Sequence, residues 1–203
     1  MDIPNYDSGK ESNNGFKQLH EHKYMPKNTF RMLIAGNSGS GKTNTLMHIL
    51  QKPLIYYDQI HLYAKNLDQD KYINLIDKMH GISEIVGYPV LITSNDEITP
   101  VDQLQDTDMQ RVVIFDDYVC EKNQKPLIDY FIQGRHKNCS VIYLTQSFYG
   151  CPKEIRLNCS HFICMIFHPQ EKEIEYLRNW ELTKKSILMQ PRNHILSVMW
   201  TNQ

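Results

Sequence analysis

The sequence has no long apolar run, and this lack sets the first limits on its function. The longest wholly apolar run near the C-terminus is Phe162–Phe167, which is far too short to cross a bilayer as a helix. At the start, the segment MDIPNYDSGK has no cationic stretch followed by an apolar one, so we expect no secretory signal. We therefore expect no membrane partner.

The sequence is also poor in cysteine and has almost no net charge. Its five cysteines are an odd number, and without an expected export signal they are interpreted as reduced thiols of a cytosol-like compartment. The formal net charge is −1, whereas proteins that simply coat nucleic acid are strongly basic. Any contact with DNA must then be local, or must be assembled from several subunits.

What the sequence does have is enough apolar material for one folded domain. Its 203 residues, 41% hydrophobic and 22% charged, suffice for a single domain with a buried core. Residues 1–27 are polar and show no apolar period, so we expect a flexible arm there. Residues 28–203 are expected to form the folded domain.

Apolar strand patterns alternate with helical patterns along this domain. Strands are expected at residues 30–35, 59–65, 88–94, 111–117, 140–146, 161–167 and 194–200. Helices are expected at 42–52, 67–80, 125–137 and 171–180, with Gly81 ending the second and Gly134 closing the third. The alternation predicts an α/β fold whose central sheet is mostly parallel and flanked by helices. Ligands bind beyond the carboxyl ends of the strands in such sheets, so we expect chemistry just after each strand.

The strongest motif directly follows the first of these strands. It fits the pattern G-x-x-x-x-G-K-[ST] in full, with Gly36, Asn37, Ser38, Gly39, Ser40, Gly41, Lys42 and Thr43. The glycines let the main chain approach phosphates, and successive N–H groups and the next helix favour an anion. Lys42 is expected to reach the β- and γ-phosphates of ATP, and the Thr43 hydroxyl to bind Mg²⁺. A glycine turn with a surface lysine is the plainer alternative, but the strand before it and the helix after it favour nucleotide binding.

A second acidic signal stands where the strand VVIF leads into Asp116 and Asp117. A carboxylate at the end of a buried strand near the phosphate loop can hold Mg²⁺, and we assign Asp116 to this role. A second acid just beyond can orient and deprotonate the attacking water, and we assign Asp117 to that role. A polar loop after a core strand is the alternative. Because a small-molecule kinase needs no such acid here, the pair favours hydrolysis.

The segment GRHKNCSVIYLTQSF places Arg135 before an apolar strand and Gln146 at its end. If this strand lies beside the Asp116 strand, the Gln146 amide can reach the γ-phosphate or the attacking water. Arg135 would then lie at the opposite end of the strand, far from the nucleotide of its own subunit. It could reach the nucleotide of a neighbour in a ring. A polar strand end and a solvated charge are the plainer interpretations of the two residues.

The order of these motifs resembles the FtsK–HerA superfamily of DNA-pumping ATPases. The motifs are the phosphate loop, the strand ending in Asp-Asp, the segment GRH and the strand ending in TQS. The segment FIQGRHKNCSVIYLTQSF is most similar to the genome-packaging ATPases of poxviruses, other large double-stranded DNA viruses and virophages. The resemblance covers about residues 29–200 and implies a RecA/FtsK-like P-loop NTPase fold. It implies that Gln146 is the sensor of the γ-phosphate and that Arg135 acts in trans, with Arg156 and Arg192 as competing candidates.

The resemblance also implies a function. The chain would be a Mg²⁺-dependent, ATP-hydrolysing motor that pumps double-stranded viral DNA into a preformed capsid. It would work as a homo-oligomeric ring of about five or six subunits with capsid proteins as partners, in the virion or in virus factories of the host cytoplasm. Bacterial chromosome translocases carry membrane spans and a DNA-reading domain, and we expect neither here. The alternatives are a translocase outside packaging, a small-molecule kinase of the same fold, and a nucleotide-gated assembly protein without turnover.

Overall fold

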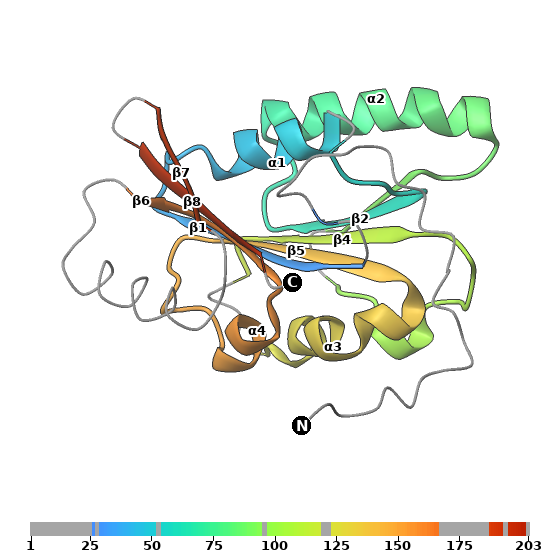
Figure 1. Ribbon diagram of the computed structural model, residues 1–203. Helices are drawn as coiled ribbons and strands as arrows, with labels where there is room; N and C mark the ends of the chain where they lie inside the picture. The colour runs from blue at the N-terminus through green and yellow to red at the C-terminus, as the bar shows by residue number, and fades with distance from the viewer. Residues whose placement is uncertain are drawn as a thin grey trace.

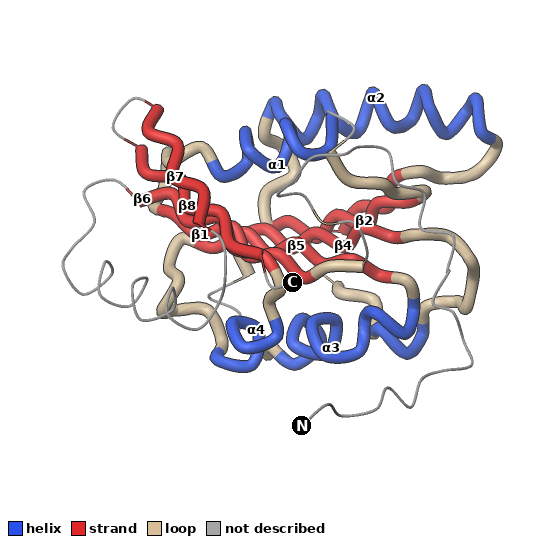
Figure 2. The backbone as a smooth tube through the Cα atoms, viewed as in Figure 1, coloured by secondary structure: helices blue, strands red, loops and turns tan. Residues whose placement is uncertain are grey.

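A central sheet of eight strands organises the part of the chain that the computed structural model describes. The structure describes Pro26 and residues 29–51, 54–94, 97–118, 123–166, 187–192 and 195–201. The expected arm at 1–27, apart from Pro26, and the expected helix at 171–180 lie outside these residues. Helices α1 and α2 cover one face of the sheet, and α3 and α4 cover the other (Figures 1 and 2).

The elements follow the expected alternation. The strands are β1 (Arg31–Gly36), β2 (Gln59–Ala64), β3 (Leu91–Ser94), β4 (Arg111–Asp116), β5 (Cys139–Thr145), β6 (His161–Ile166), β7 (Ile187–Arg192) and β8 (Ile195–Thr201). The helices are α1 (Lys42–Gln51), α2 (Asp70–Val86), α3 (Lys125–Gln133) and α4 (Lys153–Asn158), with 3-10 turns η1 (Val101–Gln103) and η2 (Gly134–Lys137). None of these helices is long and apolar enough to cross a bilayer.

The sheet is mostly parallel, as predicted. Its strand order is β3-β2-β4-β5-β1-β6-β8-β7. Strands β1 to β6 pair in parallel, whereas β8 runs antiparallel to both β6 and β7. The helical crossovers that join the parallel strands put helices on both faces, which is why the sheet is buried on both sides.

The inner strands are apolar because both of their faces are covered. Val112 and Ile114 of β4 belong to the core beneath α1 and α2, whereas Val113 and Phe115 belong to the core on the α3 side. This division follows from the alternation of side chains along a strand. Both cores together hold the carboxyl end of β4 in a fixed position.

The strand order places β5 between β1 and β4. In the parallel register Ile34 of β1 lies opposite Leu144 of β5, and Asp116 of β4 lies opposite the same residue. The expectation that the strand ending in Gln146 lies beside the Asp116 strand is therefore confirmed. The carboxyl ends of three adjacent strands meet at one edge of the sheet, and the loops that leave them share that edge.

The prediction that Gly81 ends α2 is wrong. The helix continues to Val86 and ends at Gly87, whose φ of 80° is the left-handed conformation common after helices. A glycine inside a helix costs about 1 kcal/mol relative to alanine, and this cost is offset because Ile82 packs against the core in the extended part. The sequence pattern also fails to predict α4, which has only six residues, and β7, which contains a proline.

Candidate active site

The loop between β1 and α1 has the backbone geometry of an anion cradle. Gly39 and Gly41 have φ values of 75° and 95°, a region that residues with a Cβ rarely adopt. The Ser40 N–H donates to the Asn37 carbonyl at 3.1 Å, which closes the turn. The loop leads directly into the N-terminus of α1, whose first N–H groups have no partners within the helix and suit an anion.

Gly36 occupies a position where only glycine fits. A Cβ at this residue would lie 2.6 Å from the carbonyl oxygen of Met165, 2.8 Å from its Cβ and 2.7 Å from the Ser40 Oγ. Met165 belongs to the neighbouring strand β6, so its main chain cannot rotate away. The first glycine of the motif therefore allows the close approach of β1 and β6 beneath the loop.

We expect the substitution Gly36→Ala to lower the free energy of unfolding by about 1–3 kcal/mol, because it overpacks this contact. The matched control is Gly81→Ala, since a Cβ at Gly81 meets nothing within 4 Å. That exchange should leave stability unchanged or raise it by up to about 1 kcal/mol, because alanine is the better helix former. Urea unfolding followed by circular dichroism measures both. Equal stabilities for the two variants would contradict the tight packing at Gly36.

Lys42 extends back over the loop from the first position of α1. Its Nζ donates to the Gly36 carbonyl at 2.7 Å and to the Asn37 carbonyl at 3.0 Å. Burial lowers the pKa of Lys42, whereas Asp116 and Asp117 raise it. The ammonium thus lies between the phosphate loop and the acidic strand end, where phosphate oxygens can replace the two carbonyls as partners.

Asp116 ends β4 as the more buried of the two acids. Burial raises its pKa and so does Asp117, whereas a hydrogen bond from Tyr72 and the charge of Lys42 lower it. The Tyr72 hydroxyl, from α2, donates to Asp116 Oδ2 at 2.5 Å. Tyr72 lies on the apolar stripe of α2 with Leu75, Ile76 and Met79, and sequence analysis assigned it no role in the site. A tyrosine in a stripe otherwise made of Leu, Ile and Met was the signal available.

Asp117 and Gln146 lie side by side, just beyond the ends of β4 and β5. The Gln146 Nε2 donates to Asp117 Oδ1 at 3.2 Å, and both side chains are exposed. Asp117 has a φ of 61°, which is uncommon for a residue other than glycine. Unusual backbone conformations of this kind cluster at functional sites. The structure therefore brings together the two residues that sequence reasoning assigned to the attacking water.

The oxygen atoms at this edge suit a magnesium ion. Thr43 offers a hydroxyl at the start of α1 and Asp116 a carboxylate at the end of β4, the hard donors that Mg²⁺ prefers. Burial and Asp116 raise the pKa of Tyr72, whereas a hydrogen bond with Thr43 lowers it. Within the described residues, no group of three His, Cys, Asp or Glu side chains offers an alternative metal site.

Arg135 lies at the other edge of the sheet, in η2, before the first residue of β5. Its exposed side chain lines a cavity of about 160 Å³ together with Arg31. Burial lowers the pKa of Arg31, and the neighbouring charge of Arg135 lowers it further. The structure therefore does not bring Arg135 to the phosphate loop of its own chain. It places a second cation, which sequence reasoning missed, beside it.

The competing arginines are placed differently. The Arg156 Nε donates to the Cys151 carbonyl at 3.2 Å, and its guanidinium lies over the Phe148 ring, 5.4 Å from the centroid. The side chain of Arg192 lies outside what the structure describes. Arg156 is thus held by local contacts, whereas Arg135 is exposed.

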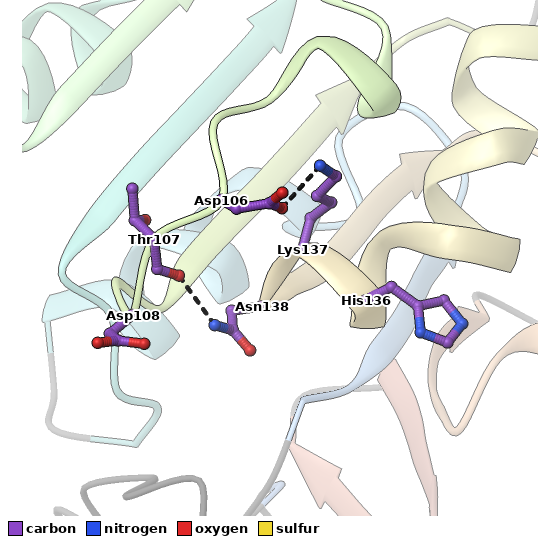
Figure 3. A pocket seen from close by; sticks show the side chains of 6 residues that line it. All are labelled: Asp106, Thr107, Asp108, His136, Lys137 and Asn138. Atoms are coloured by element: carbon purple, nitrogen blue, oxygen red, sulfur yellow. Dashed lines mark hydrogen bonds and ion pairs between the residues drawn. The ribbon is translucent and has the colours of Figure 1, made fainter.

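Side chains that line a cavity of about 420 Å³ next to Arg135 hold η2 in place (Figure 3). On its wall, Lys137 Nζ pairs with Asp106 Oδ1 at 2.7 Å, and Asn138 Nδ2 donates to the Thr107 carbonyl at 3.0 Å. Asp108 and His136 complete the lining, with His136 set apart from the other side chains (Figure 3). These contacts tie η2 to the loop before β4 and thereby fix the backbone that carries Arg135.

Comparison with known proteins decides the family. The model of the family described as Poxvirus A32 protein matches residues 17–202 of the chain. The chain belongs to the A32 family. This match confirms the resemblance to poxvirus-type packaging proteins that the sequence motifs indicated.

Curated relatives match this chain over part of a longer protein. The A32-family chain is 34% identical over 144 residues to the DNA packaging protein OPG160 of monkeypox virus, which is 67% of this chain and 47% of that protein. The identity to OPG160 of vaccinia virus (strain Copenhagen) is also 34%, with 53% of that protein covered. The chain thus spans about half the length of the curated relatives it matches.

Solved structures share the fold. The genome packaging NTPase B204 from Sulfolobus turreted icosahedral virus 2 in complex with AMP matches with a TM-score of 0.55 at 12% identity, over 86% of this chain and 98% of that one. B204, the DNA-packaging ATPase from Sulfolobus turreted icosahedral virus, matches with a TM-score of 0.51 at 15% identity and the same coverages. At these identities the likeness concerns the fold, and it confirms the predicted P-loop NTPase architecture of the A32-family chain.

Proposed function

We propose that residues 28–203 form an ATP-hydrolysing motor that packages double-stranded viral DNA into a capsid. The observation that carries this proposal is the arrangement of Lys42, Asp116, Asp117 and Gln146 around one edge of the sheet. Membership of a family whose curated relatives are DNA packaging proteins supports DNA as the cargo. A binding module without turnover would need the phosphate loop but not the paired Asp117 and Gln146.

The chemistry follows from the residues at this edge. Loop residues 36–43 bind the phosphates of ATP, with Lys42 replacing its carbonyl partners by β- and γ-phosphate oxygens. Thr43 and Asp116 would hold Mg²⁺, directly or through water, and the ion would offset phosphate charge. Asp117 accepts the proton of the attacking water, and Gln146, held to Asp117, orients that water and contacts the γ-phosphate.

The site is completed by a second subunit in this proposal. Arg135 lies at the edge opposite its own Lys42, so it can only serve the nucleotide of a neighbour. Arg31 beside it strengthens the local positive charge, which favours a phosphate group as the partner. Head-to-tail contacts of this kind form a ring when the rotation between neighbouring subunits closes. A homo-oligomeric ring of about five or six subunits also gives a chain of net charge −1 a way to assemble a DNA-binding channel.

The experiment that tests the proposal measures ATP turnover with and without long duplex DNA, beside the mass of the oligomer. We expect a multi-subunit assembly whose turnover rises on addition of DNA and falls as salt is raised, because phosphate contacts are screened. The Lys42→Ala variant, prepared in parallel, reports any contaminating ATPase. A monomer whose turnover ignores DNA would overturn the proposal, and transfer of phosphate to a small acceptor would identify a kinase. Co-purification with capsid proteins separates packaging from translocation of another kind.

A further inference from the structure

Tyr72 connects a helix outside the nucleotide motifs to the acid at the end of β4. It lies in the first turn of α2, where its N–H donates to the Gln69 carbonyl at 2.8 Å. Its side chain is completely buried in the core beneath α1 and α2. Strand β2, which precedes α2, pairs with β4 so that Ala64 lies opposite Asp116. The start of α2 is thereby placed above the carboxyl end of β4.

The partner of the hydroxyl distinguishes Tyr72 from the buried Tyr130 and the partly buried Tyr57. Tyr130 donates to the Thr99 carbonyl at 2.7 Å, and Tyr57 donates to the Leu50 carbonyl at 3.0 Å. Both hydroxyls therefore find a main-chain partner, which meets the requirement that polar groups removed from water be hydrogen-bonded. Tyr72 instead donates to the carboxylate of Asp116 at 2.5 Å.

We propose that Tyr72 is a positioning residue that fixes Asp116 in the orientation needed to hold Mg²⁺ with the nucleotide. The proposal rests on the proposed function only in requiring that the loop binds a Mg²⁺–nucleotide complex. Because Oδ2 of Asp116 accepts from Tyr72, Oδ1 remains for the ion or its water. Groups that hydrogen-bond to metal ligands orient them, and their loss usually costs about 10–100-fold in metal affinity or activity.

Removing the hydroxyl alone isolates this contact. A phenylalanine would fill the same space in the core but would leave the Asp116 carboxylate without its partner from α2.

The test compares Tyr72→Phe with Tyr130→Phe, which removes a buried hydroxyl far from the metal ligands. A fluorescent ADP analogue is titrated into each full chain, once with MgCl₂ and once with EDTA, without DNA and without turnover. For Tyr72→Phe we expect the gain in affinity on adding Mg²⁺ to fall by about 10-fold, with the affinity in EDTA unchanged. Tyr130→Phe should keep the full gain. Urea unfolding of both variants shows that each is folded.

Each other outcome is decisive. A Mg²⁺-dependent gain that is the same in Tyr72→Phe and in the wild type overturns the proposal, as does an equal loss in both tyrosine variants, which reports only general packing. A wild type whose affinity does not respond to Mg²⁺ also overturns it. The titration involves neither hydrolysis nor DNA. A chain whose turnover is not stimulated by DNA would therefore contradict the motor proposal and leave the Tyr72 result unaffected.

Discussion

Replacing Asp117 by asparagine should lower the kcat of ATP hydrolysis by about 10³-fold, within the range usual for loss of a general base. Nucleotide affinity should remain unchanged, because no part of the phosphate loop is altered. Asparagine is the replacement of choice since it tolerates positive φ, and Asp117 has a φ of 61°. Alanine would add backbone strain of about 1–2 kcal/mol at this position and confuse the result. The side-chain amide also retains an oxygen that can accept from Gln146.

Two companion variants sharpen this prediction. Asp116→Asn should weaken nucleotide binding in Mg²⁺ but not in EDTA, because it removes the carboxylate assigned to the ion. Asp77→Asn neutralises an exposed acid on α2 and should change neither turnover nor binding. Turnover is measured by phosphate release under saturating ATP. A near wild-type kcat in Asp117→Asn would show that Gln146 orients the water without help from this acid.

Arg135→Ala should lower kcat by about 10³-fold or more, as expected for an arginine that stabilises phosphoryl transfer in trans. Nucleotide affinity should be retained, because the side chain lies at the edge opposite its own phosphate loop. A mixture of inactive Arg135→Ala and inactive Lys42→Ala chains should regain activity. With random mixing at equal amounts, about one interface in four joins an intact Lys42 to an intact Arg135.

The control for the mixing experiment is a chain that carries both substitutions. Mixed with Lys42→Ala, the double variant can form no interface with both residues intact, so it should restore nothing. Arg156→Ala should reduce turnover far less than Arg135→Ala, because its guanidinium is engaged with Phe148 and the Cys151 carbonyl. Absence of rescue in the Lys42→Ala and Arg135→Ala mixture, with oligomers of normal mass, would contradict the trans assignment.

Local patterns predicted the parts of the site that lie close together in the sequence. The loop ending in Lys42 follows a strand and opens a helix, and that context is visible in consecutive residues. The proximity of Gln146 to Asp117 could be inferred because parallel strands end at one edge. Both predictions depend on the apolar pattern of the strands and on their order in the sheet. A parallel sheet buried on both faces gives a clear apolar pattern in the sequence.

Contacts that depend on packing could not be predicted in this way. The hydrogen bond from Tyr72 to Asp116 spans 44 residues, and the tyrosine fits the apolar stripe of α2 equally well without it. Gly81 carries the usual signal for a helix end, yet tertiary packing of Ile82 extends the helix beyond it. The proximity of the two cations Arg31 and Arg135 likewise arises only because β1 lies beside β5.

The position of β5 has a mechanical consequence. One strand of seven residues, Cys139–Thr145, separates η2 from Gln146, a span of about 23 Å at the usual rise of a strand. Residues 141–144 of β5 are paired on both sides, with β1 and with β4, which makes the strand a stiff connection between its two ends. In the ring proposed above, β5 would connect the γ-phosphate contact at Gln146 to the arginine that the same subunit offers to its neighbour. The nucleotide states of adjacent subunits would then be linked through a single strand.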